Sequence, residues 1–159
     1  HNVTLIDPKV DKLPLLNKMY KEYKKGQAPS TLQKLAKVFK KADAVVVVSA
    51  EYNHSIPPAL SNLIDHFMEE YFYKPSAIVS YSVGGFGGAR AAMQLRSLLP
   101  EVGMPTIPTI FSISKVQDVF DAKGNPTDKD YSKRAVKFFK ELEWYANAMK
   151  TERKKGLPK

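Results

Sequence analysis

The sequence has no cysteine among its 159 residues, and this absence excludes several kinds of chemistry at once. Disulfides, thiolate nucleophiles and cysteine-ligated metals all need that side chain. No apolar run approaches the roughly 20 residues that a helix needs to cross a bilayer. The first residues also lack a basic stretch followed by an apolar one, which is the pattern of a secretory signal. We therefore expect a cytoplasmic protein with no membrane association.

Acidic residues are scarce relative to basic ones, which gives the chain a formal net charge of +9. The basic excess lies in residues 1–41 and 112–159, whereas residues 42–111 carry more acidic than basic side chains. Such amphipathic basic flanks are usually solvated helix faces. No nucleic-acid reading motif accompanies the charge, so we expect no specific nucleic-acid binding. A positive field also attracts small anionic ligands.

Short runs of β-branched residues alternate with longer stretches of helical periodicity along the chain. Strands are predicted at residues 3–6, 44–48, 77–81 and 105–111, and helices at residues 13–23, 31–42, 57–67, 89–99 and 131–150. This alternation predicts an α/β fold with a parallel sheet covered on both faces. The run 44–48 is apolar at every position, which is typical of a strand buried on both sides. Pro108 indicates an edge or a bulge in the last strand.

One compact domain is expected over residues 1–150, because 43% hydrophobic content in a chain of this length suits a single core. Residues 151–159 are predicted to be a frayed basic tail. The last helix is expected to bury one face made of Ala135, Phe138, Phe139, Leu142 and Tyr145. Trp144 is interpreted as another packing residue of this helix.

Residues 49–57 form the first unusual loop, between an apolar strand and a helix. In open parallel sheets, ligands lie at the carboxyl ends of the strands. The free N–H groups of the following helix favour anionic or electron-rich atoms. Tyr52 offers a flat face to an aromatic ring, and Asn53 tolerates unusual backbone angles. An ordinary strand-to-helix turn explains the same residues equally well.

Residues 80–90 form the second loop, which has glycine at four of five consecutive positions, 84, 85, 87 and 88. Glycine is costly in folding entropy, but it suits a backbone that must approach a ligand closely with its N–H groups exposed. The spacing matches neither a Walker loop nor a dinucleotide fingerprint. A tight turn explains one or two of these glycines rather than four, so we predict a ligand-binding loop.

Together, these loops resemble those of the NADPH-dependent FMN reductases, a family that includes quinone and azo-dye reductases. The resemblance rests on Glu51-Tyr52-Asn53, on the helix at 57–65 and on the glycines at 84–88, and it covers roughly residues 2–111 in the right order. It implies a flavodoxin-like three-layer sandwich that binds FMN. It also implies ping-pong hydride transfer from NADPH or NADH to a flavin, quinone or azo acceptor. The cofactor supplies this chemistry, so no catalytic side chain is expected.

Position by position, the resemblance implies two groups of FMN-binding residues. The family's Pro-Glu-Tyr-Asn loop packs against the isoalloxazine, largely through backbone groups, and corresponds to Ala50, Glu51, Tyr52 and Asn53, with His54 and Ser55 beside them. Ala50 replaces the common proline, so a less rigid loop is expected. The family's glycine loop bonds the pyrimidine end of the ring and corresponds to Ser82, Val83, Gly84, Gly85 and Gly87. His54 could also donate a hydrogen bond to substrate, or be a solvent-exposed histidine.

The sequence departs from the family at its start. The family begins with a strand and a Gly-Ser-x-Arg-x-x-Ser-like loop that holds the FMN phosphate, and nothing similar precedes Val3. Such a strand, loop and crossover helix would occupy about 30 residues. We expect either a fragment or a lost phosphate site, and favour the fragment because the first strand of a flavodoxin-like sheet lies inside it. The alternative function is a non-catalytic flavodoxin-like binding module.

Asn62, Asp65 and His66 share a helix face at a spacing that could ligate a metal. Hydrogen bonds among themselves or to a neighbouring subunit explain this spacing better, and we expect no metal. Family members commonly form homodimers or homotetramers, so the same is expected here.

The aromatic residues Phe67 and 71–73 suit either the core or a subunit interface. Arg90 and Arg96 could meet the 2′-phosphate of NADPH, although surface or helix-pairing roles explain them better. A flavodoxin-type electron carrier is disfavoured, since carriers of that type are generally acidic.

Overall fold

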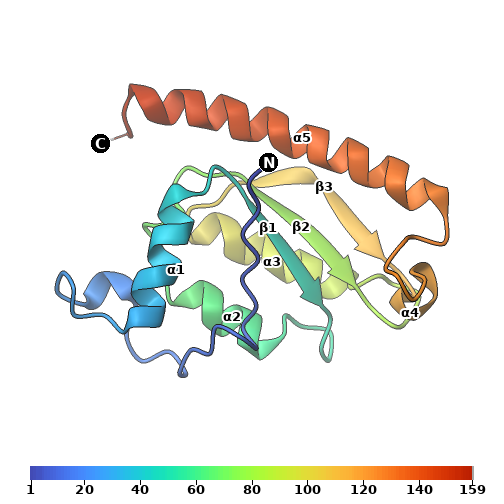
Figure 1. The fold of residues 1–159 in the computed structure, drawn as a ribbon, viewed down its shortest axis with the longest axis horizontal. Helices are drawn as coiled ribbons and strands as arrows, with labels where there is room; N and C mark the ends of the chain where they lie inside the picture. Colours follow the sequence, from blue (N-terminus) through green and yellow to red (C-terminus); the bar gives the residue numbers. More distant parts are fainter. Residues whose placement is uncertain (159) are drawn as a thin grey trace.

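The computed structural model describes residues 1–158, and its centre is a three-stranded parallel sheet in the order β1-β2-β3 (Figure 1). The strands are β1 (Val45–Ala50), β2 (Ser76–Tyr81) and β3 (Thr106–Ile113). The helices are α1 (Ser30–Lys41), α2 (Pro58–Asp65), α3 (Ala89–Glu101), α4 (Val116–Val119) and α5 (Lys129–Lys155), with a 3-10 turn η1 at Tyr20–Glu22. The predicted α/β class with a parallel sheet is confirmed.

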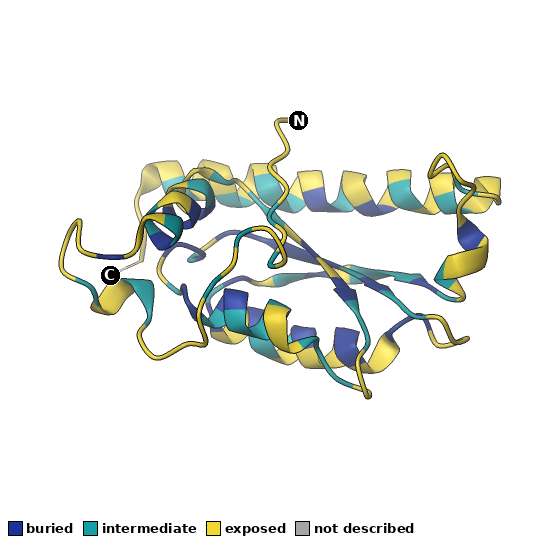
Figure 2. Ribbon diagram, turned by 60° about the horizontal axis from the view of Figure 1, so that its bottom comes forward, coloured by how far each residue is buried: buried dark blue, intermediate teal, exposed yellow. Residues whose placement is uncertain are grey.

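Helices cover the two faces of the sheet unequally. Figure 2 shows α5 along one face and α2 and α3 along the other. Ile78 of β2 points into a core shared with α2 and α3, while the preceding Ala77 packs with residues of α5. Because successive strand residues point to opposite faces, β2 is buried on both sides.

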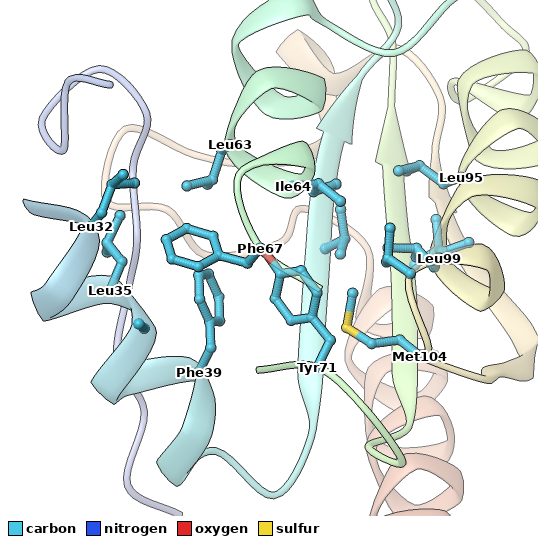
Figure 3. Close-up of a cluster of buried hydrophobic side chains, with 14 of the residues drawn as sticks. Leu32, Leu35, Phe39, Leu63, Ile64, Phe67, Tyr71, Leu95, Leu99 and Met104 are labelled. Carbon is cyan, nitrogen blue, oxygen red and sulfur yellow. The ribbon is translucent and has the colours of Figure 1, made fainter. Parts of the chain in front are cut away.

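An aromatic cluster lies in the larger core, between α1 and the sheet (Figure 3). Phe67 and Tyr71 are fully buried. Phe39 of α1 meets both rings edge-on, with ring centroids 5.1 Å and 4.8 Å away. Edge-to-face pairs at this distance stabilise a core beyond the area that they bury. Phe67 and Tyr71 are therefore core residues of one chain.

β1 is an edge strand, which corrects the expectation that residues 44–48 are buried on both sides. Val47 faces the larger core. Val46 and Val48 lie on the other face, where Val48 is 58% exposed. The cause is the position of α5, which packs mainly against β3.

β3 forms the opposite edge and carries an irregularity. Ser76 pairs with Thr106, but the next pairing joins Ile78 to Ile110, so the register shifts between them. Pro108 lies inside the shifted part and has no N–H to donate to a ladder. The prediction of an edge or a bulge is confirmed on both counts.

The segment at residues 3–6 is not a strand, contrary to prediction. Val3 and Leu5 are largely exposed, and only Ile6 packs against the larger core. Among residues 1–158, no strand pairs with this segment. Without a ladder to join, its alternating pattern has no backbone partners to fix it.

The predicted helix at 13–23 is also absent, and η1 is what remains of it. Asn62 of α2 holds this segment instead. Its side chain accepts a hydrogen bond from the Leu16 N–H at 2.9 Å and donates one to the Pro14 carbonyl at 2.9 Å. These bonds use backbone groups that a helix would need.

α5 buries one narrow stripe against the sheet. Phe138 and Leu142 are buried as predicted, whereas Ala135 and Tyr145 are half-buried. Phe139 and Trp144 are exposed, contrary to prediction, because the helix contacts the sheet along one side only. α5 also continues to Lys155, beyond the predicted end at residue 150.

Lys74 is buried, and its side chain caps the C-terminal end of α1. Its Nζ donates hydrogen bonds to the carbonyls of Phe39, of Lys40 at 3.1 Å and of Glu70 at 2.6 Å. The last carbonyls of a helix have no partners within it, so this cation satisfies two of them at the negative end of the helix dipole. Burial, with Arg153 nearby, lowers the pKa of Lys74 to about 8.

We predict that this ammonium makes stability depend on pH. The pKa of Lys74 falls from 10.5 when unfolded to about 8 when folded, so the unfolded chain binds more protons between these values. The unfolding free energy should therefore rise with pH above 8, by about 1 kcal/mol at pH about 9.5 relative to Lys74→Met. Urea unfolding of both proteins across this range measures the difference. Parallel pH profiles would contradict the prediction.

Candidate functional site

The two loops lie at the same edge of the sheet, because parallel strands present their carboxyl ends together (Figure 1). The loop at residues 51–57 follows β1, and the loop at residues 82–88 follows β2. The residues after β3 come to the same edge. The first two segments are called here the tyrosine loop and the glycine loop.

The tyrosine loop is folded into a tight turn. Tyr52 and Ser55 exchange backbone hydrogen bonds of 3.0 Å and 2.9 Å. Asn53 and His54 between them both have positive φ, 50° and 63°, which is the pattern of a type I′ turn. Asn53 therefore has the unusual backbone that its residue type allows. The turn leaves the Tyr52 side chain 59% exposed.

Glu51 joins the tyrosine loop to α3. Its carboxylate accepts hydrogen bonds from the Arg90 N–H at 2.9 Å and the Ala91 N–H at 3.3 Å, and it lies 3.6 Å from the Arg90 guanidinium. The carboxylate thus satisfies free amides at the positive end of the α3 dipole. The first turn of α3 is consequently occupied by the chain itself.

Gln94 makes a second connection, which sequence reasoning missed. Its side chain accepts hydrogen bonds from the Ser55 hydroxyl at 2.8 Å and the Ile56 N–H at 3.4 Å, and donates one to the His54 carbonyl at 2.9 Å. The contact joins residues about 40 positions apart. No local pattern around a helical glutamine indicates it.

Hydrogen bonds from Ser80 and from the segment after β3 hold the glycine loop in place. Ser80 donates to the Gly87 carbonyl at 2.7 Å, and Ser114 donates to the Gly85 carbonyl at 2.9 Å. The Lys115 N–H donates to the Gly84 carbonyl at 3.1 Å. Loop carbonyls are therefore turned towards the protein.

The four glycines of this loop divide into two pairs. Gly87 and Gly88 have φ of 59° and 73°, and a Cβ on Gly88 would lie 2.9 Å from the Tyr81 carbonyl oxygen. The fold itself requires both. Gly84 and Gly85 have no positive φ, and a Cβ on either would meet nothing within 4 Å. Folding therefore explains two of the four glycines and leaves the outer two without a structural reason.

The outer surface of both loops is exposed and largely apolar. Both loops contribute exposed side chains: Val83 and Phe86 from the glycine loop, and Tyr52 from the tyrosine loop. The guanidinium of Arg90 lies 4.9 Å from the centre of the Phe86 ring, while also facing Glu51. Backbone groups, aromatic faces and one cation are thus gathered at the carboxyl edge, an arrangement suited to a flat, hydrogen-bonding ligand.

Asn62, Asp65 and His66, whose spacing could ligate a metal, make hydrogen bonds within the chain. His66 is buried, and its Nδ1 lies 2.7 Å from the Asn62 carbonyl oxygen. Asp65 accepts a hydrogen bond from Ser61 at 3.4 Å.

Arg96, a candidate for the 2′-phosphate of NADPH, donates a hydrogen bond to the Pro108 carbonyl of β3.

A parallel α/β sheet with two anchored loops at its carboxyl edge defines a nucleotide- or flavin-binding class of fold. The model of the family described as NADPH-dependent FMN reductase matches residues 1–118. The chain belongs to this family.

Individual relatives agree with this assignment. A quinone reductase of Escherichia coli is 40% identical over 75 residues, which is 45% of this chain and 40% of the relative. A quinone reductase of Pseudomonas putida is 32% identical over 124 residues, which is 74% of this chain and 64% of the relative. The chain therefore spans less than two thirds of the length of these relatives.

Among solved structures, the flavoenzyme FerB of Paracoccus denitrificans, an NAD(P)H:(acceptor) oxidoreductase, matches with a TM-score of 0.67 and 24% identity. The match covers 89% of this chain and 78% of FerB. At this identity the likeness establishes the fold, which is flavodoxin-like as predicted.

We predict that Gln94 keeps the tyrosine loop in place. Replacing it with Ala removes three hydrogen bonds to residues 54–56, so amide exchange there should rise at least about tenfold, while stability falls by about 1 kcal/mol. Hydrogen exchange followed by mass spectrometry measures this. Met93→Ala, at an exposed position of the same helix, is the control and should leave the loop unchanged. Equal exchange in both variants would contradict the role of Gln94.

Proposed function

We propose that the chain acts as an FMN-dependent NAD(P)H oxidoreductase that reduces a flavin, quinone or azo acceptor in a ping-pong reaction. Family membership supports the reaction class. The observation that carries the proposal for this chain is the outer pair of glycines. Gly84 and Gly85 are exposed and open at the carboxyl edge, where added side chains would meet nothing but a bound molecule.

Under this proposal, the two loops hold the ring portion of FMN. An isoalloxazine needs a flat apolar contact and backbone groups at its pyrimidine edge. We propose that the ring packs against the first loop, Ala50, Glu51, Tyr52, Asn53, His54 and Ser55, and that its pyrimidine end bonds the second, Ser82, Val83, Gly84, Gly85 and Gly87. When bound, FMN supplies the hydride-accepting chemistry. The chain's own task is to hold the ring and leave one face open to donor and acceptor.

The same geometry limits where the FMN phosphate can lie. A helix N-terminus is a ready anion site. The first amides of α3 are already bonded to Glu51, however, so they are not available to the phosphate. Under this proposal, the residues described here bind the ring and the phosphate must be held elsewhere.

We further propose that the protein is cytoplasmic and works as a homodimer or homotetramer on a small-molecule acceptor, with residues 1–150 as one domain and residues 151–159 as a basic appendage. Family membership supports the small-molecule acceptor. The alternative is a flavodoxin-like binding module without turnover. The observation that favours this alternative is that the 159 residues contain no segment like the family's Gly-Ser-x-Arg-x-x-Ser phosphate loop.

Flavin titration separates the two functions. We expect the folded full chain to bind FMN with micromolar affinity and, with a quinone added, to oxidise NADPH. Gly84→Val and Gly85→Val should each weaken FMN binding by roughly tenfold or more through steric intrusion, because their backbone angles and surroundings permit valine in the free protein. Flavin fluorescence measures binding, and circular dichroism checks the fold.

Ala148→Val is a matched control, since this exposed residue of α5 lies at the opposite end of the sheet. It should leave FMN affinity unchanged. Unchanged affinity in both glycine variants would reject the ring site. A folded wild-type chain that binds no FMN would favour the module.

A further inference from the structure

The outward face of α5 carries a regular row of basic side chains. We define the lysine stripe as Lys133, Lys137, Lys140, Trp144, Thr151 and Lys155. Their spacing of three, four and seven residues places them on one side of a helix with 3.6 residues per turn. All six are exposed, and none is acidic. At about 1.5 Å per residue, the stripe runs for about 33 Å.

The lysine stripe contributes little to the fold. Phe138 and Leu142 mark the buried side of α5, and the stripe lies on the side away from them. Figure 2 shows exposed residues along the outer surface of this helix. Among residues 1–158, no ion pair joins Lys133, Lys137 or Lys140 to an acidic group. These three lysines therefore form no direct ion pair, although Asp130, Glu141 and Glu143 lie three or four residues away on the same helix.

Trp144 lies within this row and is 67% exposed, although a tryptophan usually buries most of its surface. It borders an open groove of about 640 Å³ between the end of α5 and the residues that follow it. The groove is lined mainly by apolar groups of Trp144, Ala148, Met149, Leu157 and Pro158, with polar side chains that include Arg153 and Glu152, the latter paired with Lys155. Leu157 is itself 55% exposed. A mainly apolar groove thus adjoins the lysine stripe.

We propose that this face of α5 binds the surface of an anionic lipid bilayer. Lysines near such a surface are attracted by acidic head groups, and tryptophan favours the boundary between head groups and acyl chains. A helix with this combination lies in the plane of the interface without crossing it. Binding to the surface does not require a spanning helix, and in the described part of the chain no helix has the length and apolar character to cross a membrane. The proposal does not depend on the flavin site, and it departs from the expectation of no membrane association drawn from the sequence.

The apolar groove favours lipid over nucleic acid as the partner. A polyanion such as DNA would use the lysines, and a single strand could stack on Trp144. It would leave Leu157 and the groove in water. An acyl region accepts both the indole and these aliphatic groups, so lipid accounts for the whole surface.

The chain contains one tryptophan, so its emission reports Trp144 directly. We expect vesicles of phosphatidylcholine with phosphatidylglycerol to shift this emission to the blue and to sediment the full chain. High salt should reverse both effects, because screening weakens attraction between exposed charges. Vesicles of phosphatidylcholine alone should do neither.

A charge-matched pair of variants tests the location. Lys133→Gln/Lys137→Gln/Lys140→Gln should bind anionic vesicles on the order of 100-fold more weakly, at about 1 kcal/mol per lysine. The control replaces the exposed Lys12, Lys24 and Lys25 with Gln, which changes net charge equally and should reduce binding less than about tenfold. Trp144→Ala should also sediment less with anionic vesicles.

Three outcomes would overturn the proposal. The first is the absence of a blue shift with anionic vesicles. The second is equal weakening in both triple variants, which would indicate a diffuse effect of net charge. The third is tighter binding to single-stranded or duplex DNA than to vesicles, which would make the lysine stripe a polyanion surface.

Discussion

The carboxylate of Glu51 accepts hydrogen bonds from the second and third amides of α3, those of Arg90 and Ala91, and the geometry of the candidate site depends on this contact. Glu51 belongs to the tyrosine loop, whereas α3 begins directly after the glycine loop, so one side chain fixes the distance between them. Gln94 adds a second link one turn further along α3. The tyrosine loop is thus held by hydrogen bonds to a helix whose other side is buried against the sheet. A surface that must present backbone groups cannot be fixed by apolar packing, and polar side chains hold it instead.

This contact also has a consequence for charge. The amides at a helix N-terminus attract one anion strongly, and an internal carboxylate competes with any ligand for them. Arg90 compensates Glu51 and lies over Phe86, so the positive charge of the region is directed outward across an aromatic face. Under the proposed function, this arrangement suits contact with a ring better than with a phosphate.

The parts of the fold that follow local rules could be predicted from sequence. β2, α2 and α3 were correctly predicted because periodicity and flanking proline or glycine mark them locally. The irregularity in β3 followed from the missing N–H of Pro108. Residues 3–6 and Phe139 were misassigned because an apolar pattern indicates only that a face is suited to burial. Whether it is buried depends on which neighbours the tertiary structure supplies.

The site itself was only partly predictable, for a related reason. Four clustered glycines indicate an unusual backbone, and the structure distinguishes those required by positive φ from Gly84 and Gly85, which are not. Sequence cannot separate the two pairs, since both appear as the same residue in one loop. Gln94 was missed because its function arises from a contact across about 40 residues.

α5 illustrates how the two surfaces of one helix can serve different purposes. Its inward side completes the core over β2 and β3, and its first turns lie at the same end of the sheet as the loops (Figure 1). A charge run on a helix is usually a solvated face, and that interpretation is sufficient for the lysines alone. It does not explain an exposed tryptophan in the same row, because burial of an indole elsewhere would lower the free energy. Since the lysine stripe runs along the axis of α5, a protein lying on it under this proposal would hold the carboxyl edge of the sheet near one end of the bound surface.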